Sequence, residues 1–168
     1  VVERGLESHI VVGNSLIHTY VKCGLFEDAR HVFDRLESGR RNVVTWSSMM
    51  SGYATYGHSD EAFRLFQHMQ CEGSVALNKV PFICVLKSCP SLHIGKTLHM
   101  YVVANGMDSD IVVRNALVEM YAQCGSLNLS HSVFNQSLIL DVVTFGSMMG
   151  GFIKHNQFEE ALKLFERI

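Results

Sequence analysis

The stretch VVTWSSMMSGYATYG, residues 43–57, recurs 99 residues later as VVTFGSMMGGFIKHN, residues 142–156. A second stretch, NSLI at 14–17, recurs 101 residues later as NALV at 115–118. One third of either spacing is roughly 33 residues, the size of a helix pair in repeat proteins. Because a repeated unit packs only on its neighbours, this internal repetition predicts an all-α chain of stacked helix-turn-helix units.

The recurrent residues divide the chain into units of similar length. The predicted parts are the tail of a preceding unit at 1–9, complete units at 10–42, 43–78, 79–110 and 111–141, and a truncated unit at 142–168. This division predicts a fragment of a longer array with nine or ten helices and no sheet. We expect its terminal helices to fray, because uncapped repeats expose their packing faces.

Each unit is predicted to hold two helices. The first ends at a residue type that tolerates a left-handed backbone, and these residues are Gly24, Gly57, Gly125 and Asn156. The second carries a small residue followed four positions later by Phe, at Ala29 and Phe33 in the first unit. In the irregular third unit we expect helices at 82–89 and 93–105, with a strand over 82–86 as the alternative. Residues 37–41 are expected to form a loop that tolerates insertion.

The composition indicates a folded protein with reduced thiols. Apolar residues make up 48% of the chain and charged residues 18%, and no apolar run approaches the roughly 18–20 residues of a membrane span. The net charge of −2 gives no general case for nucleic acid, although a protein that reads single-stranded bases needs less basic excess. The five cysteines are odd in number and form no CxxC pair, which favours thiols over disulfides.

The repeated motifs resemble those of the pentatricopeptide repeat family. The motifs VVTWS at 43–47 and EAFRLF at 61–66 are close to the standard unit of that family. The motif YVKCG at 20–24 resembles its short unit, and VLKSC at 85–89 resembles its long unit. The mixture is similar to the plant organellar subclass, which combines these three types. By this resemblance the fold is a right-handed superhelical solenoid, with short units at 10–42 and 111–141, standard units at 43–78 and 142–168, and a long unit at 79–110.

The resemblance implies binding of single-stranded RNA, with one base read by each repeat. In this family the fifth and last residues of a unit meet the edge of the base, and the second residue packs on its face. The implied base-reading residues are Asn14 with Asn42, Ser47 with Asn78, Ile83 with Asp110, Asn115 with Asp141, and Gly146 alone. The implied base-packing residues are Val11, Val44, Val80, Val112 and Val143.

The chemistry of these pairs limits the bases that they can read. An Asn amide both donates and accepts hydrogen bonds, whereas an Asp carboxylate only accepts them. The pair Asn115 and Asp141 therefore suits a base with an N–H donor on its edge, and the family pattern assigns it U. The same pattern implies C or U at the first unit and A at the second. The third and fifth units offer no hydrogen-bonding fifth residue, so the predicted strand is pyrimidine, A, any, U, any.

Several of these residues also have a purely structural interpretation. Asn14 and Asn115 are alternatively helix N-caps, and the valines are alternatively core residues. Lys22 and Lys154, each thirteenth in its unit, either meet phosphate or lie solvated on the surface. The Met pairs at 49–50 and 148–149 recur in helix register and are predicted core. Packing or surface roles, and no metal site, are predicted for His93, His99 and Cys89.

The sequence contains no recognisable catalytic motif. It lacks a Gly-rich phosphate loop, and it lacks the HxE and CxxC motifs of zinc deaminases. We therefore expect no enzyme activity, cofactor, metal, membrane or small-molecule substrate, with any deaminase-like domain outside this sequence. The resemblance implies the recognition part of an organellar RNA-editing (C-to-U) or RNA-processing factor, in mitochondrion or chloroplast, with single-stranded RNA and other editing factors as partners. The alternative is a protein-interaction solenoid that binds a peptide or another editing factor.

Overall fold

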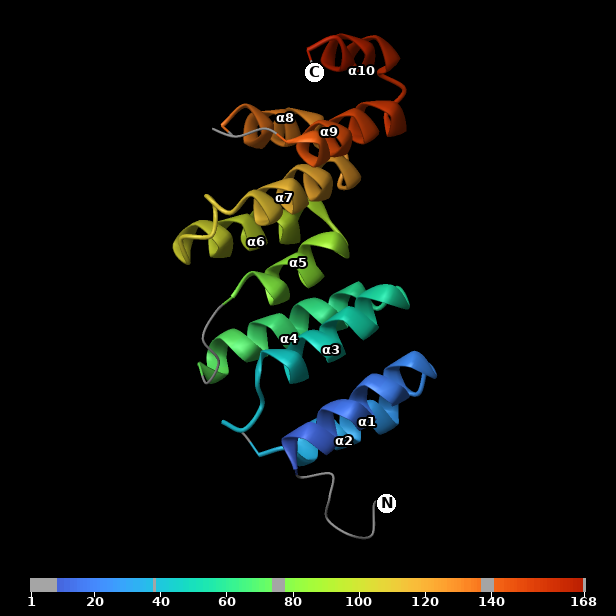
Figure 1. The fold of residues 1–168 in the computed structure, drawn as a ribbon, viewed down its shortest axis with the longest axis vertical. Coiled ribbons are helices and arrows are strands. Elements are labelled where there is room, and N and C mark those ends of the chain that lie inside the picture. The colour runs from blue at the N-terminus through green and yellow to red at the C-terminus, as the bar shows by residue number, and fades with distance from the viewer. Residues whose placement is uncertain (1–8, 38, 74–77, 137–140, 168) are drawn as a thin grey trace. The chain divides into compact units, whose positions relative to one another are not determined.

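A computed structural model describes residues 9–37, 39–73, 78–136 and 141–167, which form ten α-helices and no strand (Figure 1). The chain divides into two compact units, Val1–Ser88 and Cys89–Ile168. The first contains α1 (Ile10–Lys22), α2 (Phe26–Arg35), α3 (Val43–Thr55), α4 (Ser59–Glu72) and α5 (Lys79–Lys87). The second contains α6 (Leu92–Ala104), α7 (Ile111–Gln123), α8 (Leu127–Asn135), α9 (Val142–Lys154) and α10 (Phe158–Phe165).

These helices confirm the all-α prediction for the described part of the chain. The strand alternative over 82–86 is wrong, because that segment lies inside α5. None of the described helices is long and apolar enough to cross a membrane. The predicted tail at 1–9 lies, apart from His9, outside the described residues. The unit boundaries and the handedness of the solenoid stay predictions.

The first helix of each regular pair ends as the sequence predicts. Gly24, Gly57 and Gly125 have φ values of 73°, 82° and 81°, and Asn156 has a φ of 60°. A side chain with a Cβ rarely adopts this left-handed backbone, and Asn is among the few that tolerate it. This turn reverses the chain so that the second helix packs back on the first.

An aromatic contact between consecutive helix pairs is part of the buried core of each compact unit. Phe33 at the end of α2 meets Trp46 of α3 edge to face, with ring centroids 4.8 Å apart. Phe134 of α8 meets Phe145 of α9 in the same way at 5.4 Å. Such aromatic pairs contribute about 0.5–1.5 kcal/mol beyond the burial of their area. The small residues of the second helices, which let helices approach closely, are buried at Ala29, Ala62, Ser130 and Ala161.

The methionines largely confirm their predicted place in the core. Met49, Met50 and Met148 are completely buried, and Met149 is half-buried.

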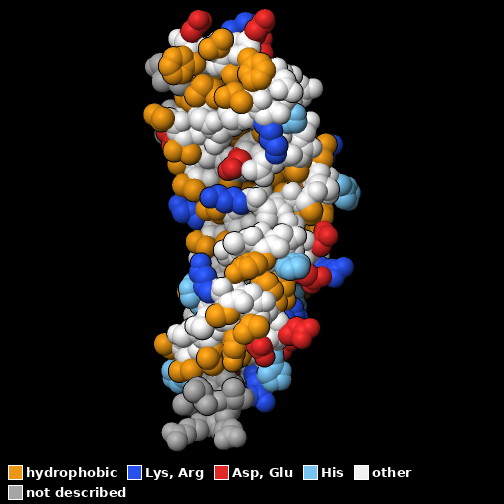
Figure 2. Space-filling model, turned by 90° about the vertical axis from the view of Figure 1, so that its right-hand side faces the viewer, with side chains coloured by type: hydrophobic (Ala, Val, Ile, Leu, Met, Phe, Trp, Pro, Cys, Tyr) orange, Lys and Arg blue, Asp and Glu red, His pale blue; other side chains and the backbone are white. Residues whose placement is uncertain are grey.

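The last Phe at the repeated position, Phe165, is exposed, unlike its equivalents in earlier units. Phe165 is 65% exposed, and Figure 2 shows hydrophobic side chains gathered over the C-terminal helices. Its equivalents Phe33 and Phe134 are covered by the first helix of the following pair, and no such helix follows Phe165 among the described residues.

The helices of the third unit start earlier than the sequence predicts. The predicted segment 82–89 is α5, Lys79–Lys87, and the predicted segment 93–105 is α6, Leu92–Ala104. Helix α5 starts before Pro81 because the side chain of Asn78 accepts from the N–H of Val80 at 2.9 Å. Pro81 then lies in the first turn, where a missing N–H leaves no helical hydrogen bond unmade.

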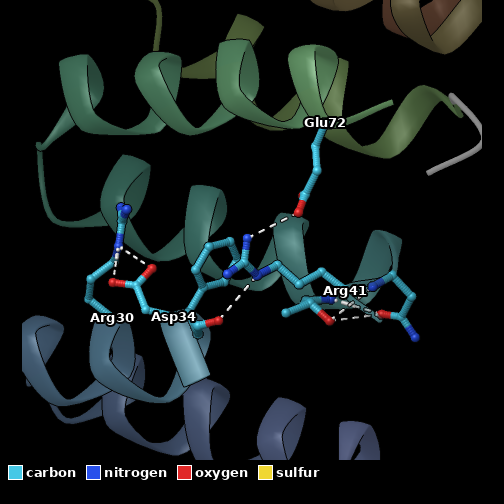
Figure 3. Close-up of polar contacts among 7 residues, drawn as sticks. Arg30, Asp34, Arg41 and Glu72 are labelled. Carbon is cyan, nitrogen blue, oxygen red and sulfur yellow. Dashed lines mark hydrogen bonds and ion pairs between the residues drawn. The ribbon is translucent and has the colours of Figure 1, made fainter. Parts of the chain in front are cut away.

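The segment predicted to tolerate insertion ends in a buried cation, Arg41, and its tolerance of insertion stays a prediction. Figure 3 shows Arg41 reaching Glu72 at the end of α4, with Nη1 and Oε1 3.3 Å apart and both side chains only 9% exposed. The Arg41 Nε also donates to the carbonyl of Phe33 at 3.2 Å, and the guanidinium lies 4.5 Å from the centre of the Phe33 ring. Arg41 therefore connects α2, α3 and α4 through an ion pair that is largely shielded from water.

Candidate nucleic-acid interface

The last residue of each complete unit is the N-cap of the next helix. Asn42 caps α3 and Asp141 caps α9, and their side chains accept from the N–H groups of Thr45 at 3.0 Å and Thr144 at 2.7 Å. Each Thr hydroxyl contacts its cap residue in return, which completes a capping box. Asn78 and Asp110 are the N-caps of α5 and α7, and their side chains accept from backbone N–H groups of the first turn. Four predicted base-reading side chains are thus fixed in place by helix capping.

Asn14 and Asn115 are not caps, so the capping interpretation of these two residues is wrong. They are the fifth residues of α1 and α7, and the N-caps of those helices are His9 and Asp110. Instead, each side chain reaches the cap of the following first helix. Asn14 Nδ2 donates to Asn42 Oδ1 at 3.4 Å, and Asn115 Nδ2 donates to Asp141 Oδ1 at 3.3 Å. The structure therefore brings together two of the predicted base-reading pairs.

Of the four residues in these two pairs, Asp141 is the ionisable one. The hydroxyl of Thr144 donates to Asp141 Oδ1 at 2.7 Å, and the N–H of Thr144 and the Asn115 amide donate to the same oxygen. These bonds, first those of Thr144 and then that of Asn115, lower the pKa of the Asp141 carboxyl. A carboxylate has about four acceptor sites, so Asp141 keeps acceptor capacity toward a ligand.

Burial separates the two members of this pair. Asn115 is 8% exposed, and its buried Oδ1 has no hydrogen-bond partner among the residues described. Asp141 is only half-buried. The equivalent Asn14 is half-buried, and its Oδ1 accepts from the Thr45 hydroxyl at 2.7 Å. The two pairs thus share a register but differ in charge and in their hydrogen-bonding capacity.

The remaining base-reading residues are less clearly paired. Ser47 Oγ donates to the carbonyl of Val43 at 2.6 Å, within its own helix. Ile83 lies on α5 in the first compact unit, whereas Asp110 caps α7 in the second. Gly146 faces open space, because a Cβ added there would meet nothing within 4 Å. These placements agree with weak discrimination at the third and fifth units, which stays a prediction.

The five predicted base-packing valines are all on the surface, so the core alternative is wrong. They are 43–65% exposed at the second position of α1, α3, α5, α7 and α9, as Val11, Val44, Val80, Val112 and Val143. The second and fifth residues of a helix share one face, because residues three apart are neighbours on it. Exposed apolar side chains therefore flank the hydrogen-bonding pairs in the same register.

Two hollows lie at equivalent places between consecutive first helices. The α1–α3 groove, of about 330 Å³, is lined by Lys22, Ser47 and Ser51 among others. The α7–α9 groove, of about 490 Å³, is lined by residues that include Val143 and Lys154. Both lysines are exposed, so either of their predicted roles is open to them.

A glycine at the tenth position of the unit lets the helices approach at each groove. A Cβ added to Gly151 would lie 2.7 Å from the Cβ of Ala122 in α7. A Cβ added to Gly52 would collide with Val21 of α1. Since carbon atoms prefer separations of about 3.5–4.0 Å, only glycine fits at these two places. This contact was not predicted, although the shared Gly at 52 and 151 is visible in the repeated stretch.

Among the residues for which the sequence predicts packing or surface roles, His99 packs against Tyr121. Its Nδ1 lies 2.9 Å from the hydroxyl of Tyr121, and burial lowers the pKa of its imidazole. Burial also raises the pKa of the Cys89 thiol to about 12. Within the described ranges, no three His, Cys, Asp or Glu side chains are placed to hold a metal ion.

Family models match much of this sequence. A model described as the PPR repeat family matches residues 41–89, and one described as the PPR repeat matches 14–40 and 143–168. Together these matches cover more than half of the chain. The chain belongs to the pentatricopeptide repeat family. The assignment to the plant organellar subclass stays a prediction.

Relatives from plants are similar to this pentatricopeptide repeat chain over its whole length. A mitochondrial pentatricopeptide repeat-containing protein of Arabidopsis thaliana is 37% identical over 171 residues, covering 100% of this chain and 26% of that protein. Another from the same plant is 35% identical over 167 residues, covering 98% and 19%. The crystal structure of the pentatricopeptide repeat protein PPR10 from maize matches 94% of this chain and 24% of its own, with a TM-score of 0.71 and 22% identity. This match confirms the helical repeat fold, and the chain spans 19–26% of the length of these proteins.

Proposed function

We propose that this chain binds single-stranded RNA, one base per repeat, as the recognition part of an organellar RNA-editing (C-to-U) or RNA-processing factor. The observation that supports this best is the recurrence of one arrangement. At the first and fourth units, a fifth-residue Asn donates to the cap residue of the next helix, at 3.4 and 3.3 Å. Exposed valines lie next to both pairs. A flat base with polar edges has the shape and chemistry that such a site would accept.

The proposed strand is pyrimidine, A, any, U, any, read from the first unit. Asn115 and Asp141 select U by accepting the ring N–H at Asp141 Oδ2 and by donating from the remaining Asn115 N–H. Two of the relatives are named as mitochondrial proteins, which favours the mitochondrion over the chloroplast as the location. The proposal assigns no catalytic step, cofactor or metal to these residues.

Titration of the chain with a short single-stranded RNA containing C-A-A-U-A tests the proposal. We expect chemical-shift changes at the amides of α1, α3, α7 and α9, and affinity that falls with added salt. The same strand in a duplex should not bind, because its base edges are already paired. Equal binding of the duplex, or shifts confined to the second helices, would reject base reading.

A second function has support from a different surface. Met100 and Val103 on α6 are 72% and 54% exposed, and they border a largely apolar hollow of about 570 Å³ with Leu129 and Tyr121. Exposed apolar surface of this kind favours a protein partner, such as another editing factor. Its position on a second helix would allow RNA and protein to bind together. Loss of a partner protein, but not of RNA, on Met100→Glu would separate the two functions.

A further inference from the structure

The α7–α9 groove contains a carboxylate, which is unexpected in a groove proposed to bind a negatively charged strand. Glu119 on α7 lines this groove together with Lys154 on α9. Its Oε1 accepts from Nε2 of Gln123, a second residue of the groove lining, at 3.1 Å. A carboxylate beside a polyphosphate strand is repulsive, so it needs a hydrogen-bond donor on the ligand to be compatible with binding.

The geometry of α9 indicates which part of a nucleotide would lie beside Glu119. Val143, Gly146, Gly150 and Lys154 follow one another at steps of three or four residues, so they form one face of the helix. All four line the groove. If a base packs on Val143 and a phosphate lies at Lys154, the sugar that connects them would lie between these two residues, on the part of the face that includes Gly150. A Cβ added to Gly150 would meet nothing within 4 Å, so the space above it is free.

We propose that Glu119 accepts a hydrogen bond from the ribose 2′-hydroxyl at the fifth unit and so favours RNA over DNA there. This inference rests on the proposed RNA binding and names the feature of the strand that this groove recognises. The 2′-hydroxyl is the one donor that the backbone of RNA has and the backbone of DNA lacks. A hydrogen bond to an ionised acceptor is roughly twice as strong as one between neutral groups.

The equivalent α1–α3 groove provides an internal comparison. Its ninth-position residues are His18 on α1 and Ser51 on α3, where the α7–α9 groove has Glu119 and Gly150. Neither His18 nor Ser51 offers a carboxylate, so the α1–α3 groove should hold a 2′-hydroxyl less tightly. Replacing the ribose by deoxyribose should therefore weaken binding more at the fifth nucleotide than at the second.

The test compares three strands that contain C-A-A-U-A: all-ribose, with one deoxyribose at the fifth nucleotide, and with one at the second. Binding to the 168-residue chain is followed by amide chemical shifts, which report Gly150 directly and tolerate weak affinity. For the wild-type chain, we expect the fifth deoxyribose to weaken binding about tenfold and the second to weaken it by less. For Glu119→Ala the fifth deoxyribose should have no effect, because the acceptor is gone.

Two further variants distinguish a hydrogen bond between Glu119 and the 2′-hydroxyl from a general effect of negative charge on RNA binding. Glu119→Gln keeps a neutral acceptor and should retain a reduced preference for ribose. Glu159→Gln removes an exposed carboxylate of α10 outside the groove and should change the affinity for all three strands equally. Equal affinity of the wild-type chain for the all-ribose strand and the fifth-deoxyribose strand would overturn the role of Glu119 alone. Failure of the all-ribose strand to bind would instead reject the proposed RNA binding.

Discussion

Replacing the neighbouring residues Gly150 and Gly151 of α9 by alanine, one at a time, should change stability in opposite directions. Both changes gain the same helix propensity, about 0.8–1.0 kcal/mol in a helix interior. At Gly150 the new Cβ meets nothing within 4 Å, so this gain should appear as added stability. At Gly151 the new Cβ would lie 2.7 Å from the Cβ of Ala122, so α7 and α9 would have to separate.

The difference in unfolding free energy between Gly150→Ala and Gly151→Ala gives the cost of moving α7 and α9 apart. Inserting a methyl group into a packed contact costs about 1–3 kcal/mol, and the propensity gain cancels in the comparison. For a chain of this size the difference corresponds to about 2–12 °C in Tm. Thermal unfolding followed by far-UV circular dichroism measures it.

Gly146→Ala is the matched control, because its Cβ would also meet nothing within 4 Å. It should behave like Gly150→Ala. If Gly151→Ala were as stable as Gly150→Ala, the approach of α7 and α9 would not depend on the missing side chain at Gly151.

Three other changes test separate parts of the structure. Arg41→Met should cost about 3–5 kcal/mol in urea unfolding because it removes one partner of a largely buried ion pair and the hydrogen bond to the Phe33 carbonyl. Adding Glu72→Leu should recover part of that loss, and a double variant less stable than Arg41→Met would contradict the pairing. Asn115→Ala should change the free energy of unfolding by less than about 1 kcal/mol, because it removes both a hydrogen bond and a buried oxygen that has no partner. A larger loss in urea unfolding would show that Asn115 has a mainly structural role. The lowered pKa of Asp141 means that its ionised form stabilises the fold above the unfolded pKa of about 3.9, and that this stability is lost as the pH falls through the lower folded pKa. Asp141→Asn should therefore flatten the dependence of Tm on pH below about pH 4, and an unchanged profile would contradict it.

Features that depend on local sequence were predictable. The left-handed turns at Gly24 and Asn156 follow from residue type and from their place in the repeat, and the structure has both. The burial of Ala29 and Phe33 follows from helical spacing in the same way. Such features need only a few adjacent residues, and the repeat shows each of them several times.

Features that depend on contacts across units were not predictable. Arg41 and Glu72 are 31 residues apart, and no repeated motif marks the pair, so the segment 37–41 resembled an ordinary loop. Nothing in the sequence tells which of Gly150 and Gly151 faces α7, because that depends on the rotation of α9 about its axis. The capping by Asn42 and Asp141 had a visible signal, a Thr three residues later, that the sequence analysis overlooked.

Reading of one base by Asn115 and Asp141 would appear as a base preference at a single nucleotide. An array of repeats that includes the fourth unit is titrated with four RNAs that differ only opposite that unit. The wild-type pair should prefer U, whereas Asn115→Thr should prefer G, because the shorter hydroxyl leaves room for a purine while Asp141 still accepts an N–H. By analogy with base contacts in DNA, the preference should be about 1–3 kcal/mol and confined to that nucleotide. The same base preference in wild type and Asn115→Thr would contradict the account.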